Sequence, residues 1–357
     1  MQVGRKVKTP ETWALGPKNI KNTTTYKYLG DIITNDGKHK HNIEARFNRT
    51  QGIIRQINTT AGSEIMRKIE TKTILQLYDT CVIPSFLNNS ESWTLTSSEE
   101  NELDKLGIRI LKRLFNLPEK TPSPAIIHSF GTLYITQQID QMKFMYLHTI
   151  LQRENDHWTK KMIYHLRHLN LGWSKNIDKK LEEYNLEQDW EKIKTLTKQS
   201  WKLSVKTAVQ NRNKQKLIDH CTEQTSQGDK IKTKTAYIYD KLKSSTYTFE
   251  PLPELLSSNK AETKTILLSR CGMLMCGVNF KATTPSVCME CQVTDNEDHR
   301  LNYCHKWQDI NFANNDVKVN FVDVFSEDRQ KLSAIIHCIQ KVWELQIGNG
   351  SMKKPTR

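Results

Sequence analysis

The chain has 357 residues, enough for two or three domains that each bury their own core. Its 53 Lys and Arg residues against 39 Asp and Glu give a formal net charge of +14, which favours a polyanionic partner such as nucleic acid. No apolar run approaches the roughly 20 residues of a membrane-spanning helix, and no apolar stretch follows the basic N-terminus as in a secretory signal. We therefore expect an intracellular protein, nuclear or cytoplasmic, with no membrane partner and no small-molecule substrate.

The first predicted element lies within residues 1–37. The stretch from Tyr26 to Thr34 is rich in aromatic and β-branched residues, and it ends at Asn35-Asp36-Gly37, a turn signal. This pattern predicts a short N-terminal β-hairpin.

Residues 38–155 show the spacing of helices. Ile43, Phe47 and Ile54 share one helical face, and two more amphipathic runs follow at 103–114 and 135–150. Ser97, followed three residues later by Glu100, predicts a capping box at the start of the second helix. We expect these helices to form a bundle.

The remaining chain divides into three predicted segments, and the fold class as a whole is expected to be mainly α. Residues 156–250 are polar and basic, which predicts either a charged helical arm or a partly disordered linker, with breaks at 227–229 and 244–246. Residues 251–310 hold an apolar helix and a cysteine cluster, and residues 311–357 form a tail with a last helix from Ser326 to Gln346.

The cysteine cluster is the strongest local signal. Its spacing, Cys-x2-Cys-x7-His-x4-Cys, allows two thiolates to meet at a tight turn while the histidine and the last cysteine converge from a short helix. Such a closed four-ligand set predicts a structural Zn²⁺ site that folds a small module and does not activate water. The alternative is free thiols with a surface histidine, and the other cysteines are expected in the core. The predicted ligands are Cys288, Cys291, His299 and Cys304.

A row of lysines lies in the basic segment. On one helix the row would form a stripe able to follow a phosphate backbone, with Trp201 and Trp190 nearby to stack on bases. A solvated helical face with both tryptophans in the core is an equally open interpretation; binding would then be sought at Arg46, Arg49 and Arg55 of the first bundle helix. The lysines of the row are Lys194, Lys198, Lys202 and Lys206.

Several enzymatic signatures are absent from the sequence. No two aspartates are adjacent, as the two-metal site of a polymerase would require, and no phosphate-binding loop, HExxH motif or GxSxG motif occurs. We therefore expect no catalytic activity from this chain.

Three stretches in order along the chain carry a resemblance. Tyr28-Leu29-Gly30 is similar to a "YLG" strand, and the segment from Pro84 to Thr96, followed by Ile108–Leu114, is similar to "P…ETWTLT…RILRR". Arg270-Cys271-Gly272 then precedes the cysteine–histidine cluster. Together they resemble the C-terminal part of a reverse transcriptase from a non-LTR retrotransposon of the endonuclease-bearing type. Asn88-Asn89-Ser90 departs from the Gly-Cys or Gly-Ala pair usual there.

The resemblance implies that residues 1–37 end the polymerase palm and that 38–155 form a helical thumb. The fingers and the catalytic aspartates would lie upstream of Met1, so we expect a truncated transposable-element protein that binds RNA or an RNA–DNA hybrid, with DNA as a further partner, without polymerising. One alternative is a host zinc-knuckle adaptor or a transcription-associated nucleic-acid-binding protein. Another is a nuclease behind the zinc motif, for which the chain after Cys304 is too short.

Overall fold

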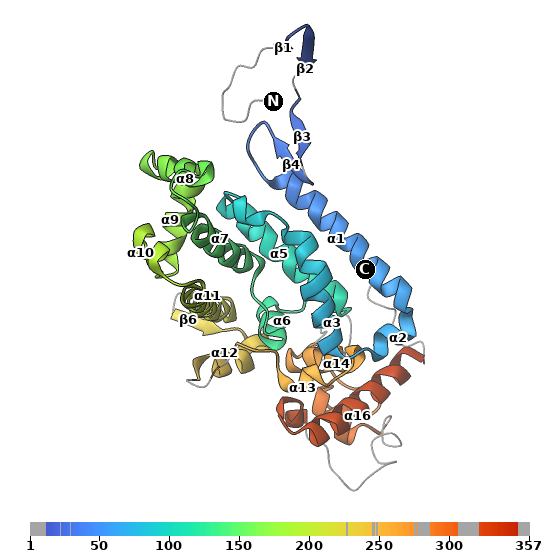
Figure 1. Cartoon of the computed structure of the whole chain (residues 1–357). Coiled ribbons are helices and arrows are strands. Elements are labelled where there is room, and N and C mark those ends of the chain that lie inside the picture. The colour runs from blue at the N-terminus through green and yellow to red at the C-terminus, as the bar shows by residue number, and fades with distance from the viewer. Residues whose placement is uncertain are drawn as a thin grey trace. The chain divides into compact units, whose positions relative to one another are not determined.

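The structure is a computed structural model, and its fold is mainly α, as predicted (Figure 1). Strands in the described part form antiparallel pairs only, β1 with β2, β3 with β4 and β5 with β6. The chain divides into two compact units, the first built from residues up to Ala61 with Gln76–Leu111 and Leu133–Lys216, and the second from the remainder. The structure describes residues 12–21, 23–28, 30–225, 228–244, 247, 249–274, 276, 286–305 and 321–348.

The first unit contains two hairpins and a set of helices. Its elements are β1 (Thr12–Leu15), β2 (Lys18–Lys21), β3 (Thr25–Tyr28), β4 (Asp31–Thr34), α1 (Lys40–Ala61), η1 (Tyr78–Val82), α4 (Ile83–Leu87), η2 (Ser90–Ser92), α5 (Ser97–Leu114), α7 (Ile135–Leu151), α8 (Trp158–His168), α9 (Gly172–Glu183), α10 (Trp190–Thr195) and α11 (Lys198–Cys221).

The predicted hairpin is present, but its turn is elsewhere. Thr25 pairs with Thr34 and Tyr28 with Asp31, so the chain reverses at residues 29–30, where Gly30 has a φ of +96°. Leu29 of the predicted "YLG" strand lies outside the described residues. The predicted turn at 35–37 instead leads into α1. There the Asp36 carboxylate accepts hydrogen bonds from the Thr34 hydroxyl (2.6 Å) and the Lys38 N–H (3.0 Å).

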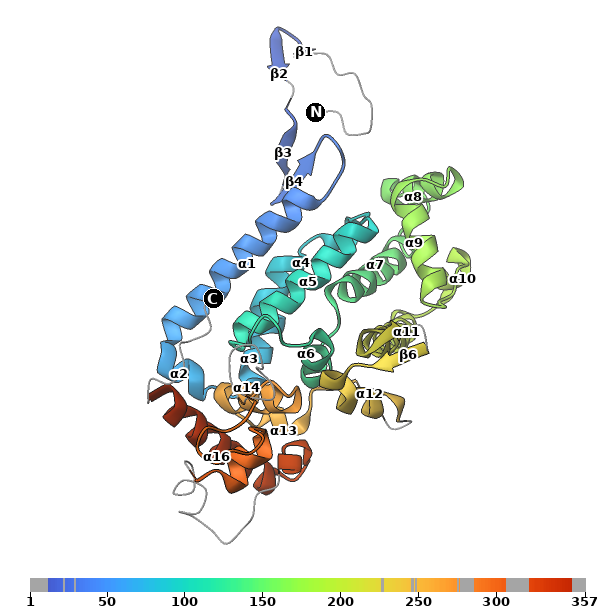
Figure 2. The same cartoon turned by 180° about the vertical axis from the view of Figure 1, so that it is seen from behind.

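The three predicted bundle helices correspond to α1, α5 and α7, which both cartoon views show side by side (Figures 1 and 2). Close packing of α5 against α7 depends on Gly107, because a Cβ atom there would lie 2.2 Å from Cγ1 of Ile135. The guanidinium of Arg109, on α5, lies 5.8 Å from the centre of the Phe47 ring of α1, and this contact joins α1 to the α5–α7 pair.

The capping box of α5 lies one residue before the predicted position. The Thr96 hydroxyl accepts from the Glu99 N–H (3.3 Å), and the Glu99 carboxylate accepts from the Thr96 N–H (2.9 Å). Because both pairs have the required three-residue spacing, the sequence alone could not choose between Ser97–Glu100 and Thr96–Glu99. Glu100 is occupied elsewhere, in an ion pair with Lys180.

The linker alternative for residues 156–250 is wrong for the part within the first unit. Trp190, Trp201 and Val205 pack in one hydrophobic core with Phe144 of α7. The predicted boundary between 155 and 156 therefore does not separate the bundle from the basic segment, because their apolar faces are buried together. Of the predicted breaks, Gln227 and residues 245–246 lie outside the described part.

The second unit is organised around α14 (Lys260–Arg270), which contacts α2 (Ser63–Lys68), α6 (Ser123–Phe130), η6 (Phe321–Phe325) and α16 (Arg329–Gly348). The Arg270 guanidinium, at the end of α14, donates to Glu254 Oε1 (2.9 Å) and to the Val324 carbonyl (2.9 Å), which joins three segments in a buried site. The described elements of the second unit are α2 (Ser63–Lys68), α3 (Thr71–Leu77), α6 (Ser123–Phe130), β5 (Thr222–Thr225), β6 (Gly228–Ile231), η3 (Thr233–Thr235), α12 (Ala236–Lys243), α13 (Pro253–Leu256), α14 (Lys260–Arg270), η4 (His299–Tyr303), η6 (Phe321–Phe325) and α16 (Arg329–Gly348).

Candidate metal centre

The first two predicted ligands lie on a tight turn closed by backbone hydrogen bonds. Val287 and Thr294 form an antiparallel bridge, and within it the Cys288 N–H donates to the Val293 carbonyl (2.8 Å). The Gln292 N–H donates to the Cys288 carbonyl (2.9 Å), with Gln292 in the left-handed region at a φ of +59°. This chain reversal brings the side chains of Cys288 and Cys291 to the same side.

The other two ligands lie at the two ends of the π-helical turn η4. The Cys304 N–H donates to the His299 carbonyl (2.8 Å), the i to i+5 bond that defines such a turn. The Asn296 side chain accepts from the His299 N–H (2.7 Å) and so caps the turn. The sequence predicts a short helix here, and the π-helical form of that helix brings residues five apart to one face.

The four side chains converge on one point. All four candidate ligand atoms lie within 4.8 Å of one another. Sγ of Cys304 lies 3.8 Å from Sγ of Cys288 and 4.0 Å from Sγ of Cys291. With metal–sulfur bonds of about 2.3 Å, the edge of a tetrahedral site is about 3.8 Å. The arrangement can therefore hold a metal ion, as the spacing predicts.

The state of the donors fits a metal ligand set. His299 is 6% exposed, and its Nε2 atom is buried with no hydrogen-bond partner among the described residues. Burial lowers the pKa of His299, which keeps the imidazole neutral and able to coordinate. Burial raises the pKa of the Cys288 thiol, but hydrogen bonds from the N–H groups of Cys291 and Glu290 outweigh it, so the pKa lies below its ordinary value.

Neighbouring groups fix the two halves of the centre. Asp295 and Arg300 form a bidentate ion pair, with both N···O distances at 2.5 Å, and this pair joins the turn to η4. The His305 N–H donates to Sγ of Cys291 (3.3 Å), as second-layer groups around metal thiolates do. Val342 of α16 packs against the cluster and helps to bury Cys304.

The other cysteines do not join the cluster. Cys271, Cys276 and Cys221 are buried, as expected of core thiols, and burial raises the pKa of Cys271 to about 12. Cys81 is exposed and Cys338 half-buried, so the core interpretation is wrong for Cys81.

The predicted lysine row is divided between two helices. Lys194 belongs to α10 and forms an ion pair with Glu191 (3.4 Å), whereas the other three lie on α11. Lys198, Lys202 and Lys206 are exposed, and no carboxylate of the described residues forms an ion pair with them. The row therefore has three members and not four.

Two other predicted contacts are wrong because their side chains are enclosed. Trp201 is 1% exposed and donates its indole N–H to the Phe144 carbonyl (2.9 Å), so it cannot stack on a base. Arg46 is 6% exposed and pairs with Asp31, which neutralises it. Arg49 and Arg55 are exposed on α1, as binding would require.

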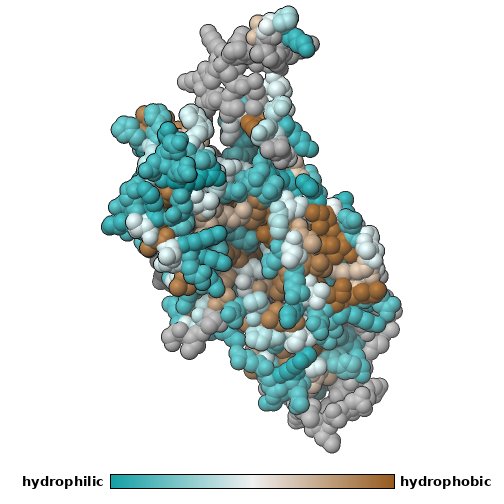
Figure 3. All heavy atoms as spheres, in the orientation of Figure 1, coloured by the Kyte–Doolittle hydropathy of each residue, from teal (hydrophilic) through white to brown (hydrophobic). Residues whose placement is uncertain are grey.

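Two exposed features lie outside the residues that the sequence predicted to bind. The first is Trp158, at the start of α8, which is 75% exposed. The surface over α8 and α10 is otherwise mostly hydrophilic (Figure 3). Lys230, Lys232 and Lys234 line a pocket of the second unit. The alternation of lysine along 230–234 was the signal that could have found this pocket.

Comparisons with protein-family models, with curated proteins and with solved structures found no match to this chain. The described residues include no helix long and apolar enough to cross a membrane. The resemblance of the sequence motifs to reverse transcriptases thus stays a prediction.

Proposed function

We propose that this chain binds nucleic acid, RNA or an RNA–DNA hybrid in the first place and DNA as a further partner, without catalysing a reaction. In this proposal it is related to the thumb and zinc segments of non-LTR reverse transcriptases. The observation that carries the proposal is the row of exposed lysines on α11, defined as Lys198, Lys202 and Lys206, which form no ion pair with a carboxylate of the described residues.

The amphipathic character of α11 supports this role. Trp201, Val205 and Val209 hold one face of the helix in the core, and the three lysines lie one turn apart along the edge of that face, where they stay exposed. Residues four apart on a helix lie on neighbouring turns about 6 Å apart, close to the spacing of phosphates along a single strand. Contacts of this kind reach phosphate and sugar and carry little sequence information.

The ion in this proposal is Zn²⁺, held by Cys288, Cys291, His299 and Cys304 in a structural site. Three thiolates and one imidazole are a donor set that Zn²⁺ favours, and with four protein ligands no position is left for water. The role of the ion is then to hold the turn and η4 together, and the cations elsewhere supply the binding.

Binding is expected to be sequence-tolerant and steeply dependent on salt. The variant Lys198→Gln/Lys202→Gln should flatten the slope of log K against log salt by about 1.4 to 1.8, because each phosphate contact contributes about 0.7 to 0.9. Fluorescence anisotropy with a labelled RNA–DNA hybrid at several salt concentrations measures this. The fold should persist, since exposed lysines contribute little to stability.

The matched control for this experiment is Lys68→Gln/Lys179→Gln. Both lysines are exposed and already paired, Lys68 with Glu64 (3.0 Å) and Lys179 with Glu183 (3.6 Å), and the change in net charge is the same. The control should keep the slope of the unaltered chain. Equal slopes in both variants would show that the α11 row is only a solvated face, and Arg49 and Arg55 would be tested next.

Primer extension by this chain on an RNA template, with magnesium or manganese, is expected to equal a no-protein control. Without paired carboxylates, nothing in the sequence holds two metal ions to align the 3′-hydroxyl with the triphosphate. Extension above the control would contradict the non-catalytic part of the proposal while leaving the binding part to its own test.

A further inference from the structure

A pocket of about 550 Å³ lies in the second unit, and none of the four candidate metal ligands is among the residues that line it. It is formed where the start of α6 faces the β6 strand and the chain that leads into α12, elements that are neighbours in both views (Figures 1 and 2). Among its lining residues are Ser123, Lys230, Lys232 and Lys234.

The pocket gathers positive charge. Three lysines line it against one carboxylate, that of Glu223. Lys230 and Lys234 are exposed, and no carboxylate of the described residues forms an ion pair with either. Glu223 is the register partner of Lys230 across the β5–β6 pair and offsets part of this charge, and a bound anion would offset the rest.

The local backbone explains why the lysines meet. Alternate residues of an extended chain project to the same side, so Lys230 at the end of β6 and Lys232 just beyond it share a face. The Lys232 ammonium donates to the His220 carbonyl (3.0 Å), which holds its side chain against the pocket. Lys234 follows in the 3₁₀ turn η3.

The wall opposite the lysines is the start of α6, which is also electropositive. α6 begins at Ser123 after Pro122 with no side-chain cap, so the positive end of this helix borders the pocket. Ser123 can donate from its hydroxyl and its N–H, whereas Pro122 and Pro124 have no N–H. Lysine ammonium groups and helix starts are both common phosphate ligands.

We propose that this pocket binds a phosphate group through Lys230, Lys232 and Lys234. The assignment of that phosphate to a nucleic-acid backbone rests on the function proposed above; a free phosphate ester is the other source of the same chemistry. The pocket would hold one phosphate on the second unit, separate from the lysine row of α11 on the first.

The first arm of the test uses the full chain and inorganic phosphate, followed by ³¹P NMR line width. Lys230→Gln/Lys234→Gln is expected to weaken phosphate binding by about tenfold, since two of three cations are lost. The control Lys241→Gln/Lys243→Gln removes the same charge from α12, outside the pocket lining, where Lys241 pairs with Glu327 (3.2 Å), and should bind like the unaltered chain. Equal weakening in both variants, or in neither, overturns the inference.

The second arm separates the sources with a short single-stranded RNA. A fall in RNA affinity in the pocket variant, with a salt slope flatter by about 1.4, supports a backbone phosphate. Unchanged RNA affinity with lost phosphate binding overturns the nucleic-acid assignment and supports a free phosphate ester. If the unaltered chain binds no RNA, the function proposed above fails, and the phosphate arm still decides the pocket. Equally tight binding of an oligoglutamate overturns phosphate in favour of an acidic peptide.

Discussion

Replacing Cys291 with serine is expected to reduce the zinc content of the purified chain from about one ion to near zero. Cys291 is one of the four candidate ligands and lies on the tight turn, and a serine hydroxyl at neutral pH does not replace a thiolate. Elemental analysis of protein purified without chelator measures the stoichiometry. The matched control is Cys81→Ser, since Cys81 is an exposed cysteine outside the cluster, and it should retain one zinc.

Loss of the ion should also destabilise the second unit. Structural zinc contributes about 10–16 kcal/mol to small zinc-finger peptides. Here Val342 and the Asp295–Arg300 pair also hold the segment, so we expect a fall of roughly 5 kcal/mol or more in the free energy of unfolding. Chemical unfolding with and without a chelator measures this fall in stability.

For the ligand assignment itself, a zinc content near zero in the unaltered chain, or full retention of zinc by Cys291→Ser, would contradict it.

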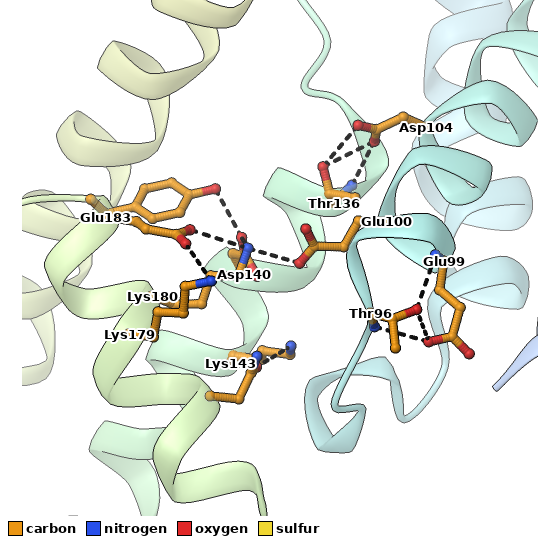
Figure 4. A network of polar contacts seen from close by, with 12 residues as sticks. Thr96, Glu99, Glu100, Asp104, Thr136, Asp140, Lys143, Lys179, Lys180 and Glu183 are labelled. Carbon is orange, nitrogen blue, oxygen red and sulfur yellow. Dashed lines mark hydrogen bonds and ion pairs between the residues drawn. The ribbon is translucent and has the colours of Figure 1, made fainter. Parts of the chain in front are cut away.

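Replacing Lys180 with methionine is expected to lower the free energy of unfolding of the first unit by about 3–5 kcal/mol, the usual cost of removing one partner from a buried ion pair. Figure 4 shows the Lys180 ammonium beside the carboxylates of Glu100 of α5, Asp140 of α7 and Glu183 of α9. Its Nζ lies 2.8 Å from Glu100, 3.2 Å from Asp140 and 3.4 Å from Glu183.

The cost arises because Asp140 has no route to solvent. Asp140 is 3% exposed, and among the described residues its carboxylate contacts Lys180 and accepts a hydrogen bond from the Tyr184 hydroxyl (3.0 Å), with the charge of Lys143 also nearby. Burial raises the pKa of Asp140 even with its partners in place. A carboxyl whose pKa is raised on folding favours the folded state at low pH and loses that stabilisation as pH rises through its folded pKa. The defect of the variant should therefore shrink as pH is lowered towards the pKa of Asp140.

Lys179→Met is the matched control, one residue away on α9. The Lys179 side chain is 71% exposed and its pair with Glu183 measures 3.6 Å, so the expected cost is below about 1 kcal/mol. Urea unfolding followed by tryptophan fluorescence compares the variants, because Trp190 and Trp201 lie in the core of this unit. Equal stabilities for the two variants would show that the network is not a buried ion cluster in solution.

The sequence by itself determined the local features of this protein. The helices α1, α5, α7, α14 and α16 follow from apolar spacing, because the period of a helix is a local property of the chain. The metal ligands could also be predicted, since all four fall within one short segment. A tight turn after Cys288 and a single π-helical turn from His299 to Cys304 suffice to bring them together.

Tertiary structure decided which of these side chains face solvent. Trp201 and Trp158 have the same chemistry, yet one is buried against α7 and the other is exposed, because burial depends on which distant helix covers a position. Arg46 is paired with Asp31, fifteen residues away along the chain, and the phosphate pocket joins residues near 123 to residues near 232. Such contacts join segments far apart in sequence, and no periodicity within either segment encodes their meeting.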